Sequence, residues 1–507
     1  MNKNRILCVI AALTALVMTY AATPQRLVIL HTNDTHSAID PTPDSDLGGI
    51  LRRKVIIDSI RACAPDVLLI DAGDAVQGTL YFNLYNGHLE QKLMNALGYD
   101  IRIIGNHEFD NGIDSLASFI SESTATRLCT NYDLRFTPLK GLFKSYEIRQ
   151  YGNRRIGFIG INVNPEGLIA PHTCPGVIYE DAIKSANVAA HWLKEKCRVD
   201  AVVAITHIGY DENGECDLAL AKLSSDIDII IGGHSHTMIL PDAADDSAPH
   251  PWVTNSKGEP VLVTQVKSSG TAIGEIDIDL TDMSKTYRVH KIDSRLDARI
   301  DKDCDAMIAP YRAGVDSLLY KCKVGVNACD LPKESTALLN FASDFMYDCG
   351  ASLAADIDFA IINKGGLRCS LPKGDLTEGR LIMLMPFNNF PTVIDIKGSD
   401  LVPAIKQMCS IGGNGVSRNV SVRYDSATSE PIEITINGRP LNPDSTYRVA
   451  TIDYLANGGD YMPSLACHNT VAMATRRLYF HLIDYVKQCY ERGIEIAPSD
   501  EARFVAQ

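Results

Sequence analysis

Several features that would place this chain of 507 residues in a special class are missing. No two cysteines are spaced as CxxC, which argues against a thiolate metal site. No low-complexity segment and no internal repeat of roughly 20–50 residues occurs, so repeat arrays are excluded. Positive charge is scarce, because 48 Lys and Arg face 62 Asp and Glu, a formal net charge of −14. Proteins that bind nucleic-acid polymers are expected to be basic, which excludes DNA or RNA as the main partner.

Long hydrophobic runs are also missing, apart from one at the start of the chain. Lys3 and Arg5 precede an apolar run over residues 6–18, and small residues follow at 21–22. This pattern predicts a cleavable export signal over residues 1–22, because the run is too short to span a bilayer. An uncleaved membrane anchor is the alternative. We expect a secreted protein, periplasmic or at the cell surface, without stable membrane insertion.

Cysteine is present but gives no pairing scheme. Of the 14 cysteines, Cys8 falls in the predicted signal, which leaves an odd number in the rest of the chain. Export to an oxidising compartment permits disulfides. At least one thiol is therefore free or paired between chains, and the disulfide pairs stay open.

The first half of the remaining chain alternates strands and helices. With 46% hydrophobic and 22% charged residues the composition is that of a soluble globular protein, and the length predicts two or three domains. Strands are expected at 27–30, 67–70, 101–104, 156–161, 201–205, 227–231 and 261–266. Helices are expected at 50–61, 89–97, 182–196 and 218–224. This alternation predicts an α/β fold of layered sheets with helices outside.

The second half begins after a charged helical stretch. This stretch runs from Arg295 to about residue 319 and is interpreted as a linker helix. A second domain is expected from about Val324, with helices at 337–347 and 475–492 and strands at 357–362, 392–396, 420–424 and 447–452.

Five short polar clusters, most of them directly after predicted strands, carry side chains that bind metals. They are Asp34-Thr35-His36, Asp71-Ala72-Gly73-Asp74, Gly105-Asn106-His107-Glu108-Phe109-Asp110, Thr206-His207 and Gly233-His234-Ser235-His236. Loops at strand ends are where α/β folds place their chemistry. Mixed Asp, Asn and His ligands suit Zn²⁺, Mn²⁺ or Fe in an open catalytic site.

Each cluster alone is more often a turn, a helix cap or a surface pair. Five together favour a single two-metal site. Two ions about 3.5–4 Å apart hold a phosphoryl group and supply a hydroxide for in-line attack on phosphorus.

His107 is interpreted differently, as a catalytic residue. Asp110 follows it by three positions and is expected to orient its imidazole toward a substrate. A phosphoryl transition state needs positive charge opposite the metals, which favours this dyad. The alternative is that His107 caps the loop and Asp110 caps the next helix.

Three stretches of the second half combine glycines, aromatics, amides and charges. They are Asn363-Lys364-Gly365-Gly366-Leu367-Arg368, Pro386-Phe387-Asn388-Asn389-Phe390 and Tyr454-Leu455-Ala456-Asn457-Gly458-Gly459-Asp460. Glycines let an arginine reach an anion, aromatic rings with a nearby amide can hold and read a base, and an acid can bind ribose hydroxyls. For each aromatic alone, packing in a core is the alternative.

The motifs HTNDTH, DAGD, GNHEFD, THIGYD and GGHSHT, in this order over about residues 26–280, resemble the 5′-nucleotidase family. The resemblance implies an N-terminal four-layer calcineurin-like metallophosphatase β-sandwich flanked by helices, and a smaller α/β C-terminal substrate domain. The implied boundaries are a signal at 1–22, a metallophosphatase domain at 23–294, a linker helix or hinge at 295–323 and a nucleotide-binding domain at 324–507.

The same resemblance implies a role for each candidate residue. One metal ion would be held by Asp34, His36, Asp74 and His236, and a second by Asp74, Asn106, His207 and His234. His107 and Asp110 would form the catalytic dyad. Substrate contacts would come from Asn363 near the nucleotide, Arg368 on phosphate, Phe387 and Tyr454 on the base, Asn389 on the base and Asp460 on the ribose.

Three positions depart from the family pattern and bear on the substrate. Lys333 stands where an arginine is usual, Lys364 replaces a glycine and Tyr454 replaces a phenylalanine.

We expect a secreted 5′-nucleotidase that uses two divalent ions to release nucleoside and phosphate from a small nucleotide, in nucleotide catabolism. Alternatives are a 2′,3′-cyclic nucleotide phosphodiesterase, a UDP-sugar diphosphatase, or a nucleotide-binding surface protein without catalysis. Metal identity, base preference and oligomeric state stay open.

Overall fold

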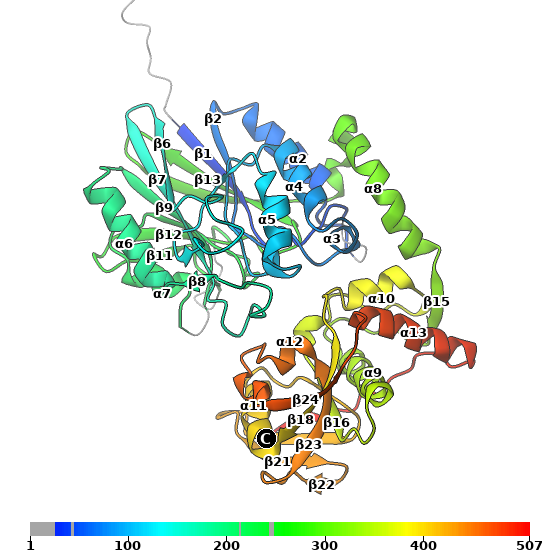
Figure 1. Cartoon of the computed structure of the whole chain (residues 1–507). Helices are drawn as coiled ribbons and strands as arrows, with labels where there is room; N and C mark the ends of the chain where they lie inside the picture. Colours follow the sequence, from blue (N-terminus) through cyan, green and yellow to red (C-terminus); the bar gives the residue numbers. More distant parts are fainter. Residues whose placement is uncertain (1–25, 42–44, 212–213, 243–247) are drawn as a thin grey trace, which may run out of the picture.

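The computed structural model describes residues 26–41, 45–211, 214–242 and 248–507. Two lobes, from the first and second halves of the chain, are joined by the long helix α8 (Lys302–Tyr320) (Figure 1). The predicted export signal at 1–22 lies outside the described residues. Within those described residues, no helix has the length and apolarity needed to cross a membrane.

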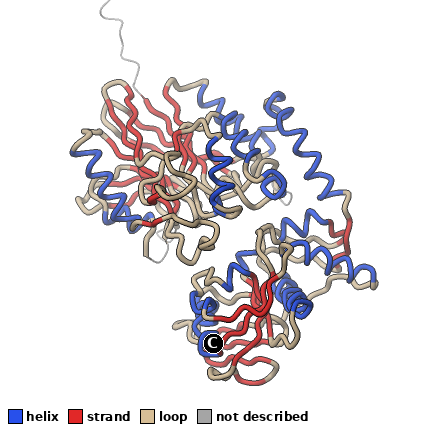
Figure 2. The backbone as a smooth tube through the Cα atoms, in the orientation of Figure 1, coloured by secondary structure: helices blue, strands red, loops and turns tan. Residues whose placement is uncertain are grey.

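The first lobe contains two six-stranded sheets, seen as two groups of red strands in Figure 2. The first sheet has the order β14 (Lys285–Lys291), β13 (Ala272–Asp279), β1 (Arg26–Thr32), β2 (Asp66–Asp71), β3 (Ile101–Arg102), β4 (Thr126–Arg127). The second has the order β11 (Trp252–Thr254), β12 (Pro260–Thr264), β10 (Ile229–Ile231), β9 (Ala201–His207), β7 (Arg154–Asn162), β6 (Tyr146–Tyr151).

Alternating side chains pack each sheet on both faces. In β1, Leu27 and Ile29 face the core between the two sheets, where they meet Phe158 of β7. Val28 and Leu30 point the other way, into a core shared with helices. Since successive side chains of a strand point to opposite faces, the continuous apolar run of β1 is what a strand buried on both sides requires.

Helices cover the outer faces, so the first lobe has four layers. On the first sheet lie α2 (Ile50–Arg61), α3 (Leu80–Tyr85), α4 (His88–Leu97) and α5 (Ile113–Ser121), with a short turn η1 (His107–Phe109). On the second lie α6 (Ala182–Glu195) and α7 (Asp217–Leu223), and β5 (Tyr132–Asp133) pairs with β8 (Ile178–Tyr179). Small residues Ala182, Ala186 and Ala190 of α6 are fully buried against this sheet. The predicted four-layer α/β fold is confirmed.

The expected linker helix is broken into two pieces. A 3₁₀ turn, η2 (Ser294–Arg299), comes first, and α8 begins only at Lys302. Asp301 separates them because its side chain accepts the N–H groups of Asp303 and Cys304, which makes it an N-cap. The prediction of one helix from Arg295 is therefore wrong at its start. α8 packs against α3 of the first lobe and against α10 of the second.

The second lobe is a smaller α/β unit built on a five-stranded sheet. Its order is β19 (Gly415–Val416), β16 (Phe359–Ile362), β23 (Thr446–Ile452), β18 (Pro391–Lys397), β24 (His468–Met473). A second sheet has the order β22 (Arg439–Pro440), β21 (Pro431–Ile436), β20 (Val420–Tyr424), β25 (Phe504–Ala506), and β15 (Lys323–Asn327) pairs with β17 (Gly374–Thr377). Its helices are α9 (Thr336–Leu353), α10 (Glu378–Leu384), α11 (Gly398–Ser410), α12 (Asp453–Ala456) and α13 (Leu478–Glu491), with turns η3 (Lys364–Gly366) and η4 (Pro463–Ala466).

Strand direction gathers the polar clusters of the first lobe. β1, β2 and β3 run parallel, and so do β9, β10 and β12. The carboxyl ends of parallel strands meet at one edge of a sheet, so the loops after β1, β2, β3, β9 and β10 come together. Several strands are shorter than predicted. β3 ends at Arg102 rather than residue 104, because the chain then turns toward Gly105, and β10 and β16 each begin two residues later than expected.

The core between the two sheets offers a stability test. Phe158 has no exposed surface, whereas Phe136 is 77% exposed. Phe158→Ala should lower the free energy of unfolding by about 3–5 kcal/mol, and Phe136→Ala by at most about 0.5 kcal/mol. The two tryptophans of the chain, Trp192 and Trp252, both lie in the first lobe. Urea unfolding followed by tryptophan fluorescence therefore reports this lobe, and equal losses in both variants would contradict the packing described.

Candidate metal centre and the cavity beside it

The seven predicted metal ligands lie on five loops at one end of the first lobe. Asp34 and His36 follow β1, Asp74 follows β2 and Asn106 follows β3. His207 is the last residue of β9, and His234 and His236 follow β10. Residues as far apart in the sequence as Asp34 and His236 are therefore brought together by the parallel strand order.

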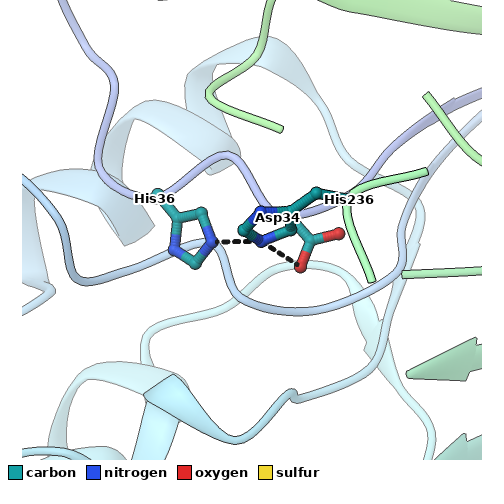
Figure 3. Close-up of side chains that lie close together, drawn as sticks. All are labelled: Asp34, His36 and His236. Carbon is teal, nitrogen blue, oxygen red and sulfur yellow. Dashed lines mark hydrogen bonds and ion pairs between the residues drawn. The ribbon is translucent and has the colours of Figure 1, made fainter. Parts of the chain in front are cut away.

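One group of converging atoms contains Asp34, His36 and His236 (Figure 3). The Nε2 atoms of His36 and His236 lie 2.9 Å apart, and His236 Nε2 lies 3.5 Å from Asp34 Oδ1. At this distance one imidazole nitrogen must donate a proton and the other must accept it, so the two nitrogens cannot both be protonated. A bound cation can take the place of this proton. This group has the ligand types of a metal site.

A second group contains Asp34, Asp74 and His207. His207 Nε2 lies 3.2 Å from Asp74 Oδ2 and 3.8 Å from Asp34 Oδ1. Asp34 thus belongs to both groups, whereas the family resemblance assigns the shared position to Asp74. The remaining two candidate ligands lie beside it, with His234 Nδ1 3.0 Å from Asn106 Oδ1. The His234 backbone N–H donates to both carboxylate oxygens of Asp34, at 3.1 Å each.

His207 provides the test of whether a metal ion fits here. Its Nδ1 lies 2.7 Å from the carbonyl oxygen of Ala72, an atom that only accepts, so Nδ1 carries the proton. Its Nε2 is buried and makes no hydrogen bond among the described residues, yet it faces two carboxylates. Burial lowers the pKa of His207, but the carboxylates of Asp74 and Asp34 outweigh it and raise that pKa to about 10. The position demands a positive charge, and a divalent metal ion supplies one.

Two of the candidate histidines, His234 and His36, are kept neutral, as metal ligands must be. Burial, reinforced by the charge of His207, lowers the pKa of His234 to about 4. Burial also holds the pKa of His36 well below its usual value, and the charge of Arg368 adds to this effect. The Asp74 pKa stays well below its usual value despite burial, because His207 and His107 stabilise the carboxylate.

The backbone at these ligands is strained. Five of the seven adopt positive φ values: Asp34 (48°), His36 (47°), Asp74 (53°), His234 (76°) and His236 (54°). Residues other than glycine rarely adopt this region, and such outliers concentrate at functional sites. Glycines allow the loops to approach: a Cβ on Gly105 would lie 2.2 Å from Asp74 Oδ1 and 2.6 Å from His207 Nε2.

The predicted dyad forms, and a third residue joins it. His107 Nδ1 lies 2.9 Å from Asp110 Oδ2, and the amide of Gln77 donates to the same oxygen at 2.9 Å. The His107 backbone N–H donates to Asp74 Oδ1 at 2.9 Å, which ties the dyad to a candidate ligand. Burial lowers the pKa of His107, but Asp110 and Asp74 raise it above its usual value. The sequence analysis missed Gln77, which is fully buried and has a φ of 68°.

Glu108 is the second residue that the sequence analysis missed. Its carboxylate accepts three backbone N–H groups, from Asp74 (3.0 Å), Ala75 (3.0 Å) and Gly105 (2.6 Å). Arg102, also buried, lies 3.4 Å from it. Glu108 therefore holds the loop after β2 to the loop after β3. A glutamate next to His107 within GNHEFD was the signal, but its partners are visible only in the fold.

A cavity of about 250 Å³ adjoins the candidate metal centre. The first lobe lines it with Asn106, His107, Asp110 and His234, and with residues 168–170 and 172–173 of the loop after β7. The second lobe contributes all six predicted substrate residues: Asn363, Arg368, Phe387, Asn389, Tyr454 and Asp460. Residues from the two lobes thus form one cavity with the candidate ligands at one end.

Contacts between the lobes shape this cavity. The ring of Phe387 stacks on His107, with centroids 5.6 Å apart, and the Arg368 guanidinium lies 5.6 Å from the Phe387 centroid. Tyr454 Oη donates to Asp460 Oδ1 at 2.9 Å and lies 3.3 Å from the Gly167 carbonyl oxygen of the first lobe. Burial raises the pKa of Asp460 and lowers that of Arg368. The buried Oδ1 of Asn363 makes no hydrogen bond with the described residues, so an acceptor points into the cavity.

Two family models match the chain. The calcineurin-like phosphoesterase model matches residues 27–238, and the model of the 5′-nucleotidase C-terminal domain matches residues 319–466. The first range contains every candidate metal ligand and the His107–Asp110 pair. The second contains the six residues that the second lobe contributes to the cavity.

Similar proteins agree with both models. The trifunctional nucleotide phosphoesterase protein YfkN of Bacillus subtilis is 31% identical over 94% of this chain, which spans about a third (34%) of that protein's length. The 5′-nucleotidase of Bos taurus is 27% identical, over 87% of this chain and 84% of that protein. The crystal structure of a 5′-nucleotidase precursor from Thermus thermophilus superposes with a TM-score of 0.83 at 29% identity, covering 95% of this chain and 99% of that one.

The three hydrogen bonds to Glu108 give a testable prediction for metal binding. In Glu108→Gln one acceptor oxygen becomes an NH₂ group, which faces a backbone N–H instead of accepting from it. Calorimetry should show affinity for Zn²⁺ or Mn²⁺ reduced about 10–100-fold, the usual effect of changing a residue behind the ligands. Glu275→Gln is the matched control, since Glu275 is also buried but contacts Arg26, Arg288 and His290. Equal metal affinity in both variants, with thermal unfolding showing both folded, would contradict this role.

Proposed function

Because the chain belongs to the 5′-nucleotidase family and is a phosphoric ester hydrolase, we propose that it hydrolyses nucleoside 5′-monophosphates to nucleoside and phosphate, with two divalent metal ions. One observation carries this proposal. A single cavity places two of the seven candidate ligands, Asn106 and His234, beside the aromatic, amide and acidic side chains of the second lobe. A phosphate ester would bind at the end beside the candidate metal ligands, and a nucleoside would fit the end lined by the second lobe.

The metal end would be built by Asp34, His36, Asp74, Asn106, His207, His234 and His236. When bound, two divalent ions would polarise the phosphoryl group and lower the pKa of the attacking water. The chain's own part is to keep Asp74 ionised and the imidazoles of His234 and His36 neutral, as their shifted pKa values indicate. The observed donor set fits ions such as Zn²⁺ or Mn²⁺.

His107 would stabilise charge on the phosphoryl oxygens. Its Nδ1 is engaged by Asp110, so its Nε2 is the atom left to donate a proton or hydrogen bond toward the substrate. Gln77 holds Asp110 in place through the shared Oδ2 atom. Asp110 and Asp74 raise the pKa of His107 despite its burial, which favours the protonated ring, and a protonated ring would stabilise a transition state with charge on oxygen.

The nucleoside end would be built by the second lobe. Phe387 and Tyr454 offer rings to a base, and Asn389 offers an amide for its polar edge. Asp460, whose carboxylate already accepts from Tyr454, would accept a ribose hydroxyl. Arg368 lines the same cavity and would contact phosphate. Burial lowers the pKa of Arg368, whereas the charges of Asp74 and Asp110 act in the opposite direction.

A broader phosphoesterase activity is the second candidate. The Bacillus subtilis relative is a trifunctional nucleotide phosphoesterase by name, and the match covers nearly the whole of this chain. Faster turnover of 2′,3′-cyclic nucleotides or UDP-sugars than of any monophosphate would favour this candidate.

We also propose that residues 1–22 direct export, so the purified secreted protein should begin near residue 23.

Removal of metal tests the hydrolase proposal. Purified protein should release phosphate from AMP, and a chelator should stop the release until Zn²⁺ or Mn²⁺ is added back. Asp74→Asn should lower kcat/KM by more than about a hundredfold, beyond the loss typical of residues behind the ligands. Asp114→Asn, an exposed position in α5, is the control and should retain full activity. Full activity of Asp74→Asn would exclude the metal mechanism.

Stacking on Phe387 tests the nucleoside end. Loss of one stacked aromatic costs about 1–3 kcal/mol per base, so Phe387→Ala should raise KM for AMP roughly 5–150-fold. A phosphate ester without a base, such as glycerol phosphate, should show little change, since it has nothing to stack. An equal rise in KM for AMP and for glycerol phosphate would mean that Phe387 acts on His107 rather than on the base.

A further inference from the structure

Gln265 comes directly after β12, and its side chain has no exposed surface. It is not one of the seven candidate ligands, and it does not line the cavity of about 250 Å³ beside the metal centre. Because β12 runs parallel to β10, Gln265 lies next to the loop that carries His234 and His236. Gly232 of that loop donates its N–H to the Thr264 carbonyl oxygen at 2.8 Å, which holds the loop against the end of β12.

The amide of Gln265 contacts three alternate positions of this loop. Its Nε2 donates to the Gly233 carbonyl oxygen at 2.9 Å. Its Oε1 accepts from the Ser235 hydroxyl at 3.1 Å and from the backbone N–H of Thr237. These three positions come directly before, between and after the two histidines of the loop. One side chain therefore holds the loop on both sides of each histidine.

An amide suits this place because one end must donate and the other must accept. The Gly233 carbonyl oxygen only accepts, and the Thr237 N–H only donates, so the two ends of the Gln265 amide cannot be exchanged. A carboxylate would place a second acceptor against the Gly233 carbonyl oxygen. An apolar side chain of the same length would make none of the three hydrogen bonds.

Ser235 extends these contacts to a further loop with a candidate ligand. Its hydroxyl accepts the Tyr210 N–H at 3.0 Å and lies 2.9 Å from Thr237 Oγ1. Tyr210 belongs to the loop after β9, the strand whose last residue is His207. The loops after β9 and β10 are thus joined to Gln265 through one hydroxyl.

The two histidines need this support because their backbone is strained. His234 and His236 adopt left-handed φ values of 76° and 54°, which persist only where the surrounding contacts determine them strongly. In the proposed site their imidazoles belong to different ions, since His236 lies beside His36 and His234 lies beside Asn106. A shift of this loop would therefore move one candidate ligand of each ion.

We propose that Gln265 is a positioning residue for both metal ions, because it fixes the loop that carries one ligand of each. The inference rests on the proposed function for the role of these ions in hydrolysis. Loss of the Gln265 contacts should weaken the binding of both ions together. Loss of the His236 imidazole should instead weaken chiefly one ion.

Metal titration tests this proposal. Gln265→Met keeps the length of the side chain and removes all three hydrogen bonds. Calorimetric titration of Zn²⁺ or Mn²⁺ into the metal-free protein should show the affinity for both ions reduced about 10–100-fold. His236→Ala is the comparison, and metal analysis should find that it retains one ion. Unchanged affinity in Gln265→Met, or the loss of one ion only, would overturn the joint role.

Asn340→Leu is the matched control for the loss of a buried amide. Asn340 is also buried, and its amide donates to the carbonyl oxygens of Ser499 (2.9 Å) and Glu501 (3.0 Å), all within the second lobe. Its replacement should leave the metal affinity unchanged, with thermal unfolding showing both variants folded. An equal loss of metal affinity in both variants would mean that a general loosening of the fold is responsible, which contradicts the proposal.

Excess metal separates a positioning role from a purely structural one. Saturating Zn²⁺ or Mn²⁺ should restore most of kcat for AMP in Gln265→Met, because added metal compensates for weaker binding. Activity that stays lost in a protein holding both ions would contradict the assignment. Titration needs no turnover, so Gln265-dependent metal binding in a protein that fails to hydrolyse AMP would refute the nucleotidase proposal and leave this one standing.

Discussion

The structure depends on keeping ionised carboxylates buried beside imidazoles. Asp34 and Asp74 have almost no exposed surface, and an isolated carboxylate in such a place costs several kcal/mol or takes up a proton. Neither happens, because the facing His207 and the neighbouring N–H groups stabilise the charge. The same field raises the pKa of His207 and marks where a divalent ion belongs. The electrostatic demand for a cation is thus built into the fold.

The candidate ligands are held in place by backbone conformations that would otherwise be unfavourable. Left-handed φ values at Asp34, Asp74 and His236 persist only if the surrounding contacts determine them strongly. Glu108 provides such contacts for Asp74 through three hydrogen bonds to two loops, and Gly105 removes the side chain that would collide. The β-sandwich that carries the strained loops is stabilised by a large cluster of buried apolar side chains. The strained loops therefore depend on the rigid sheets that carry them.

Much of this could be predicted from the sequence because the signals are local. Each ligand lies a few residues past an apolar run, so strand ends could be placed, and the helix at 50–61 has the predicted bounds. Gln77 and Glu108 could not be found, because their partners lie far away in the sequence and leave no local pattern. Gln77 donates to the carboxylate of Asp110, and Glu108 accepts from the backbone N–H groups of Asp74 and Ala75. The break before α8 was missed because an N-cap at Asp301 inside a charged stretch looks like any other acid. Which side chains converge in each candidate group follows from side-chain geometry that no motif encodes.

The placement of the substrate residues has a consequence for specificity. The candidate metal ligands and His107 belong to the first lobe, whereas Arg368 and the residues proposed to bind the nucleoside belong to the second. The distance between the two sets is therefore set by how the lobes meet. Three contacts fix that distance here: Asn83 donates to the Pro386 carbonyl oxygen at 2.8 Å, Phe387 stacks on His107, and Tyr454 reaches the Gly167 carbonyl oxygen. None of these is a contact to a substrate. A change at Asn83 would alter which nucleotide spans the cavity without touching a candidate ligand or a side chain proposed to bind the base, because the length between the two ends, and not only the chemistry at each end, selects the substrate.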